Sequence, residues 1–266
     1  MLDLKSREKC ESEMFDRETL ADLGIERLDE LEDELLRLSD NRITMHLNFS
    51  SSPPRPYRYA LYQLQNLAGK KILDFCSGSG ETSVIIAKKG AAFVESFDIS
   101  QIAVNIAKRR MKVNKVDQIV NVEAMSAYSL TYPDAFFDIV YGNAVLHHLD
   151  LESALKEICR VLKDGGECIF CEPFSGSRAL RSIRDKIPIK SNLSQYERQL
   201  DTQDVEFLAD CFSWSKFKYF GFFSRFDAVL ERERVIEALW NFDRPLLSSW
   251  PFLKRYSRAF VIKAIK

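Results

Sequence analysis

The 266-residue chain contains no run of 18 apolar residues, and its first five residues, Met-Leu-Asp-Leu-Lys, lack the apolar core of a signal peptide. We therefore expect a cytoplasmic protein without a membrane-spanning segment. The chain also has no excess charge of either sign, because 38 basic residues stand against 39 acidic ones. A net charge of −1 gives no general attraction to nucleic acid, so no nucleic-acid partner is expected.

The six cysteines lack the regular spacing of a disulfide framework. Cys168 and Cys171 have the CxxC spacing of many metal sites, but they lie in an apolar run that predicts a strand. Side chains three residues apart on a strand point to opposite faces, so this pair is poorly placed to share one ion. We expect buried free thiols and no metal site.

The sequence does contain a strand–turn–helix unit, which begins at residues 71–80, Lys-Ile-Leu-Asp-Phe-Cys-Ser-Gly-Ser-Gly. The apolar residues predict a short buried strand, Gly78 and Gly80 a tight turn, and residues 82–87 the start of a helix. Such a unit presents backbone N–H groups to a ligand at a helix N-terminus. Asp74 favours a ligand with an ammonium group, because a carboxylate at this place would repel a pyrophosphate.

Strands and helices alternate after residue 71, which predicts a Rossmann-like, doubly wound α/β sheet with mostly parallel strands and an antiparallel last strand. In open sheets of this class, ligands lie beyond the carboxyl ends of the strands. We expect strands at 71–76, 92–98, 119–123, 137–142, 167–172, 216–223 and 259–264, and helices at 80–89, 100–113, 151–162, 200–212 and 226–241.

Several segments resemble the class I S-adenosylmethionine-dependent methyltransferases, and in particular their type 11 branch. Residues 73–80 match the first motif of that class, hydrophobic-Asp-x-Gly-x-Gly-x-Gly, with Cys76 at the first glycine. Further similar segments are Glu123–Ala127, Phe137–Val140, the Leu-His-His of residues 146–148, and Ile158–Gly166. Together they cover roughly residues 57–174. No NPPY-like tetrad follows the fourth strand, which argues against methylation of an exocyclic base amine.

The resemblance implies S-adenosylmethionine as the cofactor. Asp98, at the end of the second strand, can accept hydrogen bonds from a ribose diol, which suits adenosylmethionine and NAD equally. Ser126 stands where the family commonly has an adenine-binding Asp. The residues expected to bind the cofactor are Asp74, Cys76, Gly78, Gly80, Asp98, Ile99, Ser126, Ala127 and Asn143.

The expected function is methyl transfer to a small-molecule acceptor, with His147 or His148 as a general base if the acceptor is a hydroxyl. If the segment after the fourth strand is helical, the four-residue spacing from Asn143 favours His147 as the inward histidine. Arg181 and Arg184 share a predicted helical face, which is either solvated or a binding site for a phosphate or carboxylate. C- or N-methylation without a base, an NAD-dependent oxidoreductase and a non-catalytic cofactor-binding protein remain open.

Residues 1–56 are expected to form a helical N-terminal extension, joined by a Ser- and Pro-rich linker at 48–56 to a methyltransferase domain at 57–266. Leucines at 28, 31, 35 and 38 recur at helical spacing, so we expect an amphipathic helix there, preceded by another near 5–21. The leucines pack on the chain's own domain, as a lid or otherwise, or they form a homodimer interface. Within the domain, residues 175–256 are expected to contribute elements on the substrate side.

Overall fold

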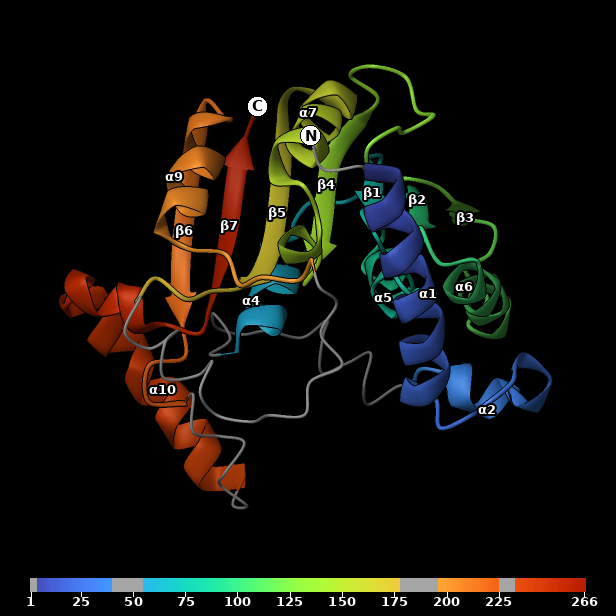
Figure 1. The fold of residues 1–266 in the computed structure, drawn as a ribbon, viewed down its shortest axis with the longest axis horizontal. Coiled ribbons are helices and arrows are strands. Elements are labelled where there is room, and N and C mark those ends of the chain that lie inside the picture. The colour runs from blue at the N-terminus through green and yellow to red at the C-terminus, as the bar shows by residue number, and fades with distance from the viewer. Residues whose placement is uncertain (1–3, 40–54, 178–195, 225–232) are drawn as a thin grey trace.

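A computed structural model describes residues 4–39, 55–177, 196–224 and 233–266. Its centre is a seven-stranded sheet in the order β3-β2-β1-β4-β5-β7-β6 (Figure 1). Strands β1 to β5 pair in parallel, and β7 is antiparallel to both of its neighbours. The predicted fold class is therefore confirmed. The strands are β1 (Lys71–Asp74), β2 (Phe93–Asp98), β3 (Val120–Ala124), β4 (Phe137–Asn143), β5 (Leu162–Pro173), β6 (Trp214–Phe220) and β7 (Ala259–Ile265).

Helices cover both faces of the sheet, which explains why its central strands are almost continuously apolar. In β1, for example, Ile72 packs on one face and Leu73 on the other, and both are fully buried. One core lies under α4 (Pro56–Gln63), α5 (Glu81–Lys88) and α6 (Gln101–Val113). The other lies under α7 (Leu151–Val161) and α9 (Thr202–Asp210).

The strand order reverses between β1 and β4, whose neighbours on either side are β2 and β5. This is the switch point at which sheets of this kind bind their ligands. The glycine turn after β1 and the segment after β4 meet at this point. The C-terminal elements α10 (Glu233–Ser249) and η4 (Pro251–Tyr256) lie beside β6, away from the switch point (Figure 1).

The N-terminal segment begins with the expected helix, α1 (Leu4–Asp22), which contacts α6. The predicted leucine-rich helix is wrong as a single element, because it is broken into η1 (Leu28–Glu30) and α2 (Asp33–Leu36). Leu31 and Leu36 are nevertheless buried against Ile106 of α6. The segment follows the surface of α6, so its leucines reach the core without keeping a helical period. None of the helices in the described ranges is long and apolar enough to cross a membrane.

Candidate active site

The turn between β1 and α5 crosses the ends of the two neighbouring strands. The Phe75 amide donates to the carbonyl of Tyr141 on β4 at 2.7 Å, and the Ser77 amide donates to Phe97 on β2 at 2.8 Å. Cys76 has φ +52°, in the left-handed region that a glycine adopts without steric cost. Cys76, which stands at the first glycine of the motif, thus adopts the backbone conformation that a glycine favours.

Gly80 has a packing role that the sequence analysis did not anticipate. It caps α5 with φ +80°, and a Cβ atom there would lie 2.7 Å from Met111 and 2.9 Å from Ala107 of α6. Gly80 therefore lets α5 and α6 approach each other closely. It does not line the pocket described below, whereas Gly78 and Cys76 do.

Asp74 ends β1 and is 2% exposed. Its Oδ2 accepts a hydrogen bond of 2.5 Å from Ser83 on α5. Burial raises the pKa of Asp74 to about 7, against the opposing effect of the Ser83 hydroxyl. In the described part of the chain, Asp74 forms no ion pair, so a cationic group that enters the pocket can pair with its carboxylate.

Asp98 ends β2 and connects the glycine turn to the next helix. Its two carboxylate oxygens accept from the Gly78 amide at 2.8 Å and from the Ser100 amide at 3.0 Å. Burial raises the pKa of Asp98, while these backbone hydrogen bonds oppose the rise. Each oxygen keeps a further lone pair, so Asp98 can still accept from a ligand hydroxyl.

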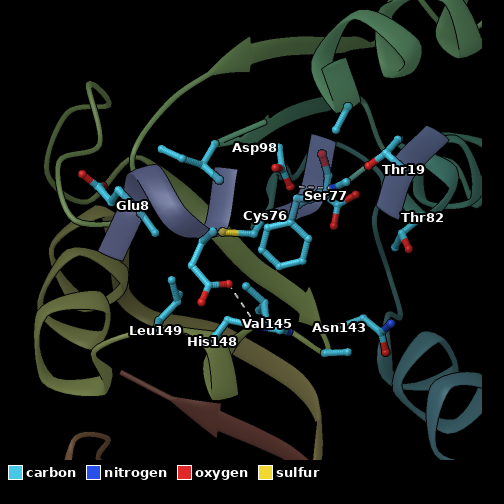
Figure 2. A pocket seen from close by; sticks show the side chains of 18 of the residues that line it. Glu8, Thr19, Cys76, Ser77, Thr82, Asp98, Asn143, Val145, His148 and Leu149 are labelled. Carbon is cyan, nitrogen blue, oxygen red and sulfur yellow. Dashed lines mark hydrogen bonds and ion pairs between the residues drawn. The ribbon is translucent and has the colours of Figure 1, made fainter. Parts of the chain in front are cut away.

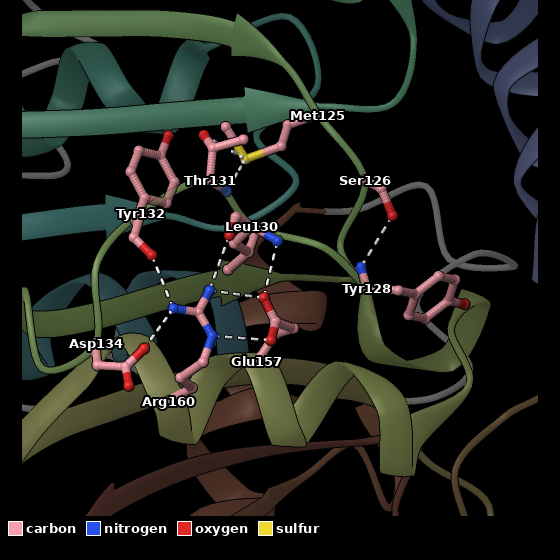
Figure 3. Close-up of polar contacts among 9 residues, drawn as sticks. All are labelled: Met125, Ser126, Tyr128, Leu130, Thr131, Tyr132, Asp134, Glu157 and Arg160. Atoms are coloured by element: carbon pink, nitrogen blue, oxygen red, sulfur yellow. Dashed lines mark hydrogen bonds and ion pairs between the residues drawn. The ribbon is translucent and has the colours of Figure 1, made fainter.

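The segment after β3 is fixed to α7 by one arginine (Figure 3). The Arg160 guanidinium donates to Glu157, to Asp134 and to the carbonyls of Leu130 and Tyr132, all at 2.8–2.9 Å. Glu157 in turn accepts from the Leu130 amide at 2.8 Å. This network was not apparent from the sequence, because it joins residues 130–134 to α7 across 26 to 30 residues of chain.

Ala127 and Tyr128, which precede this anchored segment, reach the pocket, but Ser126 does not line it. The Ser126 hydroxyl accepts from the Tyr128 amide at 3.0 Å and donates to Glu8 of α1. The Ser126 hydroxyl, which was expected to contact adenine, is therefore already bonded to Glu8 and to the Tyr128 amide. Ala127 lines the pocket and is the better placed of the two residues.

The segment after β4 differs from the helix assumed in the sequence analysis. β4 continues to Asn143, Ala144 takes φ +54°, and a single 3₁₀ turn, η2 (Leu146–His148), follows. The helical spacing between Asn143 and His147 is therefore absent. His148 lines the pocket and His147 does not, so the preference for His147 was wrong.

His147 points instead to Glu172 at the end of β5. Its Nδ1 lies 2.9 Å from Oε2 of Glu172. The other oxygen of Glu172 accepts from the amides of Val145 and Leu146, each at 3.0 Å. Glu172 is 1% exposed, so this carboxylate fixes both the backbone of the turn and the orientation of the His147 ring.

Helix α1 forms the roof of the pocket, and the sequence analysis did not predict which of its residues face inward. Arg7 donates to the His148 carbonyl, at 2.8 Å from Nε. Phe15 packs edge-on against the His148 ring, with centroids 5.0 Å apart, and Glu11 Oε2 lies 3.2 Å from His148 Nδ1. Asp16 accepts hydrogen bonds from the Ser100 hydroxyl and, at 3.4 Å, from the Ile102 amide, at the start of α6.

These elements enclose a cavity of about 240 Å³ between α1 and the carboxyl ends of β1, β2 and β4 (Figure 2). Figure 2 shows Asp98, Ser77 and Cys76 on one side of it and Asn143, Val145 and His148 on another. Arg181 and Arg184 lie outside the described residues. Of the residues predicted from the sequence, the cavity brings together Asp74, Cys76, Gly78, Asp98, Ile99, Ala127, Asn143 and His148.

Residues 73–170 match the family described as "Methyltransferase domain". The chain is 36% identical to 27-O-demethylrifamycin SV methyltransferase of Amycolatopsis mediterranei (strain S699) over 100 residues. This matched stretch makes up 37% of each of the two chains. Over 158 residues the chain is 28% identical to the ubiquinone/menaquinone biosynthesis C-methyltransferase UbiE of Laribacter hongkongensis (strain HLHK9), which is 57% of each.

Residues 73–170 are thus similar to the domain of class I S-adenosylmethionine-dependent methyltransferases. The motif residues at the switch point and the family match over the same segment support this assignment. The matched region spans only 37% of the rifamycin enzyme and 57% of the UbiE protein. The likeness is thus a likeness of domains.

Solved structures share the fold of the methyltransferase domain at low identity. Geranyl diphosphate C-methyltransferase from Streptomyces coelicolor A3(2), in complex with Mg²⁺, geranyl diphosphate and S-adenosyl-L-homocysteine, has a TM-score of 0.55 at 14% identity over 77% of both chains. The [4+2]-cyclase SpnF has a TM-score of 0.56 at 18% identity, over 78% of this chain and 79% of that one. Because one of these neighbours is a cyclase, the fold alone does not specify the reaction.

Proposed function

We propose that this chain transfers a methyl group from S-adenosylmethionine to a small-molecule acceptor that binds beside His148. The observation that carries the proposal is the pairing of Asp74 and Asp98 in one buried cavity. A buried carboxylate with a pKa near 7 and no cationic neighbour among the described residues is matched by the ammonium group of adenosylmethionine. Asp98, at the end of the adjacent strand, suits the ribose diol.

The remaining residues divide the cavity between the ends of such a ligand. Gly78 and Cys76 place backbone close to the amino-acid end, and Ala127 and Tyr128 lie where the segment after β3 would meet an adenine. Asn143 and His148 come from the opposite wall, after β4. An acceptor on that wall would lie next to the sulfonium methyl group.

Methyl transfer from a sulfonium is a direct displacement, so alignment of donor and acceptor supplies most of the rate, roughly 7–11 kcal/mol. A general base adds about 10²–10⁴-fold for a hydroxyl acceptor. We infer that His148 is this base, because it faces the cavity and its Nδ1 lies against the Glu11 carboxylate. The imidazole takes the hydroxyl proton, the oxygen bonds to the methyl carbon, and the carbon–sulfur bond breaks to release adenosylhomocysteine.

Calorimetry with the full chain tests the cofactor assignment. We expect saturable binding of adenosylmethionine and adenosylhomocysteine and none of NAD, with binding weakened by Asp98→Asn. The oxidoreductase alternative predicts the reverse pattern, and that result would sink the proposal.

Incubation with methyl-labelled adenosylmethionine and a small-molecule extract tests transfer itself. With a 13C-labelled methyl group, label should appear in a low-molecular-weight product, and the chemical shift of the transferred methyl carbon distinguishes an oxygen, a nitrogen and a carbon acceptor. Cofactor binding without labelled product would instead favour a non-catalytic cofactor-binding protein.

A further inference from the structure

Two histidines and a glutamate gather around η2, where His148 lines the cavity and the other two residues lie behind it. His147 and His148 belong to η2, and Glu197 lies in the segment that leads into α9. One ring nitrogen of each histidine and one Glu197 oxygen all lie within 4.8 Å of one another. Both histidines are buried, and the Glu197 side chain is 21% exposed.

The positions of these three residues are set by hydrogen bonds from the backbone. The Arg198 amide donates to the His147 carbonyl at 3.2 Å, which holds the Glu197 segment against η2. As a result Oε1 of Glu197 lies 4.0 Å from Nε2 of His147. The two imidazole rings are 4.1 Å apart between centroids.

The His147 ring is oriented in the way that metal-binding histidines are. Glu172 already accepts two backbone amides on one oxygen, and its other oxygen lies 2.9 Å from His147 Nδ1. The carboxylate therefore needs a proton on Nδ1, which leaves the lone pair on Nε2, the nitrogen that faces Glu197. A carboxylate on the far nitrogen is the usual support of a histidine ligand.

His148 also lies next to a carboxylate, since its Nδ1 is 3.2 Å from Oε2 of the buried Glu11, although these two atoms are not hydrogen-bonded. Glu18, two turns further along α1 on the same side, adds to the negative charge. Burial raises the pKa of Glu18; His148 opposes that rise, and Asp22, Glu197 and Glu11 add to it. The carboxylates of Glu11, Glu18 and Glu197 thus gather beside His148, and a bound cation would be favourable among them.

We propose that His147, His148 and Glu197 bind a divalent first-row transition metal ion at the acceptor side of the cavity. Two imidazole nitrogens and one carboxylate oxygen suit Zn²⁺, Fe²⁺, Co²⁺ or Ni²⁺, whereas Mg²⁺ and Ca²⁺ prefer oxygen ligands alone. Bonds of about 2.0–2.2 Å place ligand atoms roughly 3–3.4 Å apart, so the three groups must close in by about 1 Å. The partly exposed side chain of Glu197 can make that movement.

The metal site itself does not depend on the proposed methyl transfer, but its chemical consequence does. An ion at this place would bind an acceptor oxygen and favour its deprotonation. The proton then leaves to water, the oxygen bonds to the methyl carbon, and the carbon–sulfur bond breaks to release adenosylhomocysteine. His148 accepts the proton in the metal-free protein and becomes a ligand when the ion is bound.

The test uses the full chain after removal of metals with a chelator. Titration with Zn²⁺ should show one tight site, and Co²⁺ should produce a visible absorption band, while Mg²⁺ should give neither. Glu197→Gln should weaken Zn²⁺ binding at least tenfold and change the Co²⁺ spectrum. Glu206→Gln, an exposed position on α9, is the matched control and should leave both readouts unchanged.

His147→Gln provides a second variant, with its melting temperature compared with that of the parent. Failure of the parent to bind Zn²⁺ or Co²⁺ would overturn the proposal. So would binding that Glu197→Gln and folded His147→Gln leave unaltered, because the ion would then lie elsewhere, for instance on cysteines. Adenosylhomocysteine binding is measured on the same samples. If it persists without a metal site, the proposed methyl transfer stands and only the metal site is lost.

Discussion

Asp74 shows at the scale of one residue how a binding site is maintained at a cost to the free protein. Its carboxylate is buried at the end of β1, accepts one hydroxyl from Ser83, and has its pKa raised to about 7. A residue chosen only for stability at this place would be apolar. The carboxylate makes sense if a ligand with an ammonium group pairs with it.

The first prediction follows from the protonation of Asp74. Below pH 7 this carboxyl is mostly neutral in the free protein and must lose its proton before it can pair with an ammonium. Adenosylhomocysteine should therefore bind roughly eightfold more tightly at about pH 7.5 than at about pH 6. Calorimetry at the two pH values measures the difference, and Asp74→Asn should bind weakly with little dependence on pH. Equal affinity of the parent at both pH values would show that Asp74 does not meet the ligand's amine.

His148 and His147 are neighbours in sequence with different surroundings, and a second prediction separates them. In chelated protein, His148→Ala should lower turnover by about 10²–10⁴-fold with little change in cofactor affinity. The acid limb of the pH–rate profile should disappear with it. Glu152→Gln, exposed in the first turn of α7, serves as the control. Turnover of His148→Ala within a few-fold of the parent would favour a carbon or amine acceptor and alignment alone.

Among the elements, α1 has the largest effect on the cavity. Four polar residues, at positions 7, 8, 11 and 19, line the roof together with Phe15. Asp16 and Ser12 attach the helix to the end of β2 and the start of α6. A cofactor cannot be enclosed on this side without α1. We therefore propose that the helix is a lid, which is one of the two roles expected for the N-terminal extension.

A third prediction concerns this lid. Removal of residues 1–22 should leave the sheet folded, because Leu31, Leu36 and Leu38 remain to cover α6 and its core. Adenosylhomocysteine should then dissociate at least tenfold faster, as followed by stopped-flow fluorescence, and turnover should fall more than cofactor affinity. Arg7→Ala keeps the helix but removes the links of this side chain to the His148 carbonyl and to Tyr196. It should show a smaller change in the same direction. Unchanged dissociation and turnover in the shortened chain would show that α1 is no lid.

For the whole molecule, the buried acid at the switch point links stability to pH. The pKa of Asp74 is about 3.8 in an unfolded chain and about 7 in the folded one. Folding therefore favours the protonated form, so this group costs nothing at low pH and destabilises the fold as pH rises from about 4 to about 7. The full shift corresponds to at most about 4 kcal/mol.

The fourth prediction is that Asp74→Asn stabilises the ligand-free protein at about pH 8 and has little effect near pH 4. Urea unfolding at the two pH values gives the difference in the free energy of unfolding. A saturating cofactor should reverse the order at pH 8, because only the parent gains from the ion pair with it. If the variant is the less stable protein at pH 8 without ligand, the carboxylate is better accommodated than its burial implies.

The sequence by itself determined the parts of the site that are encoded locally. A strand that ends in Asp74, a turn that needs positive φ at Gly78, and a helix start are all properties of about 15 adjacent residues, so the pattern predicts them. The same holds for Asp98, because parallel strands bring their carboxyl ends to one edge of the sheet. These segments were enough to predict the fold class and the part of the cavity formed by the turn after β1 and by Asp98.

Only the tertiary structure decided which histidine faces the cavity and what covers it. The orientation of His147 depends on Glu172, 25 residues away, and on the left-handed backbone of Ala144. The contact of Arg7 with His148 spans 141 residues. α1 presents a polar face to the site, which apolar periodicity cannot reveal, because that signal marks only surfaces that are buried against a hydrophobic core. Contacts between polar groups far apart in the chain leave no regular spacing, and they become visible only when the fold has brought the groups together.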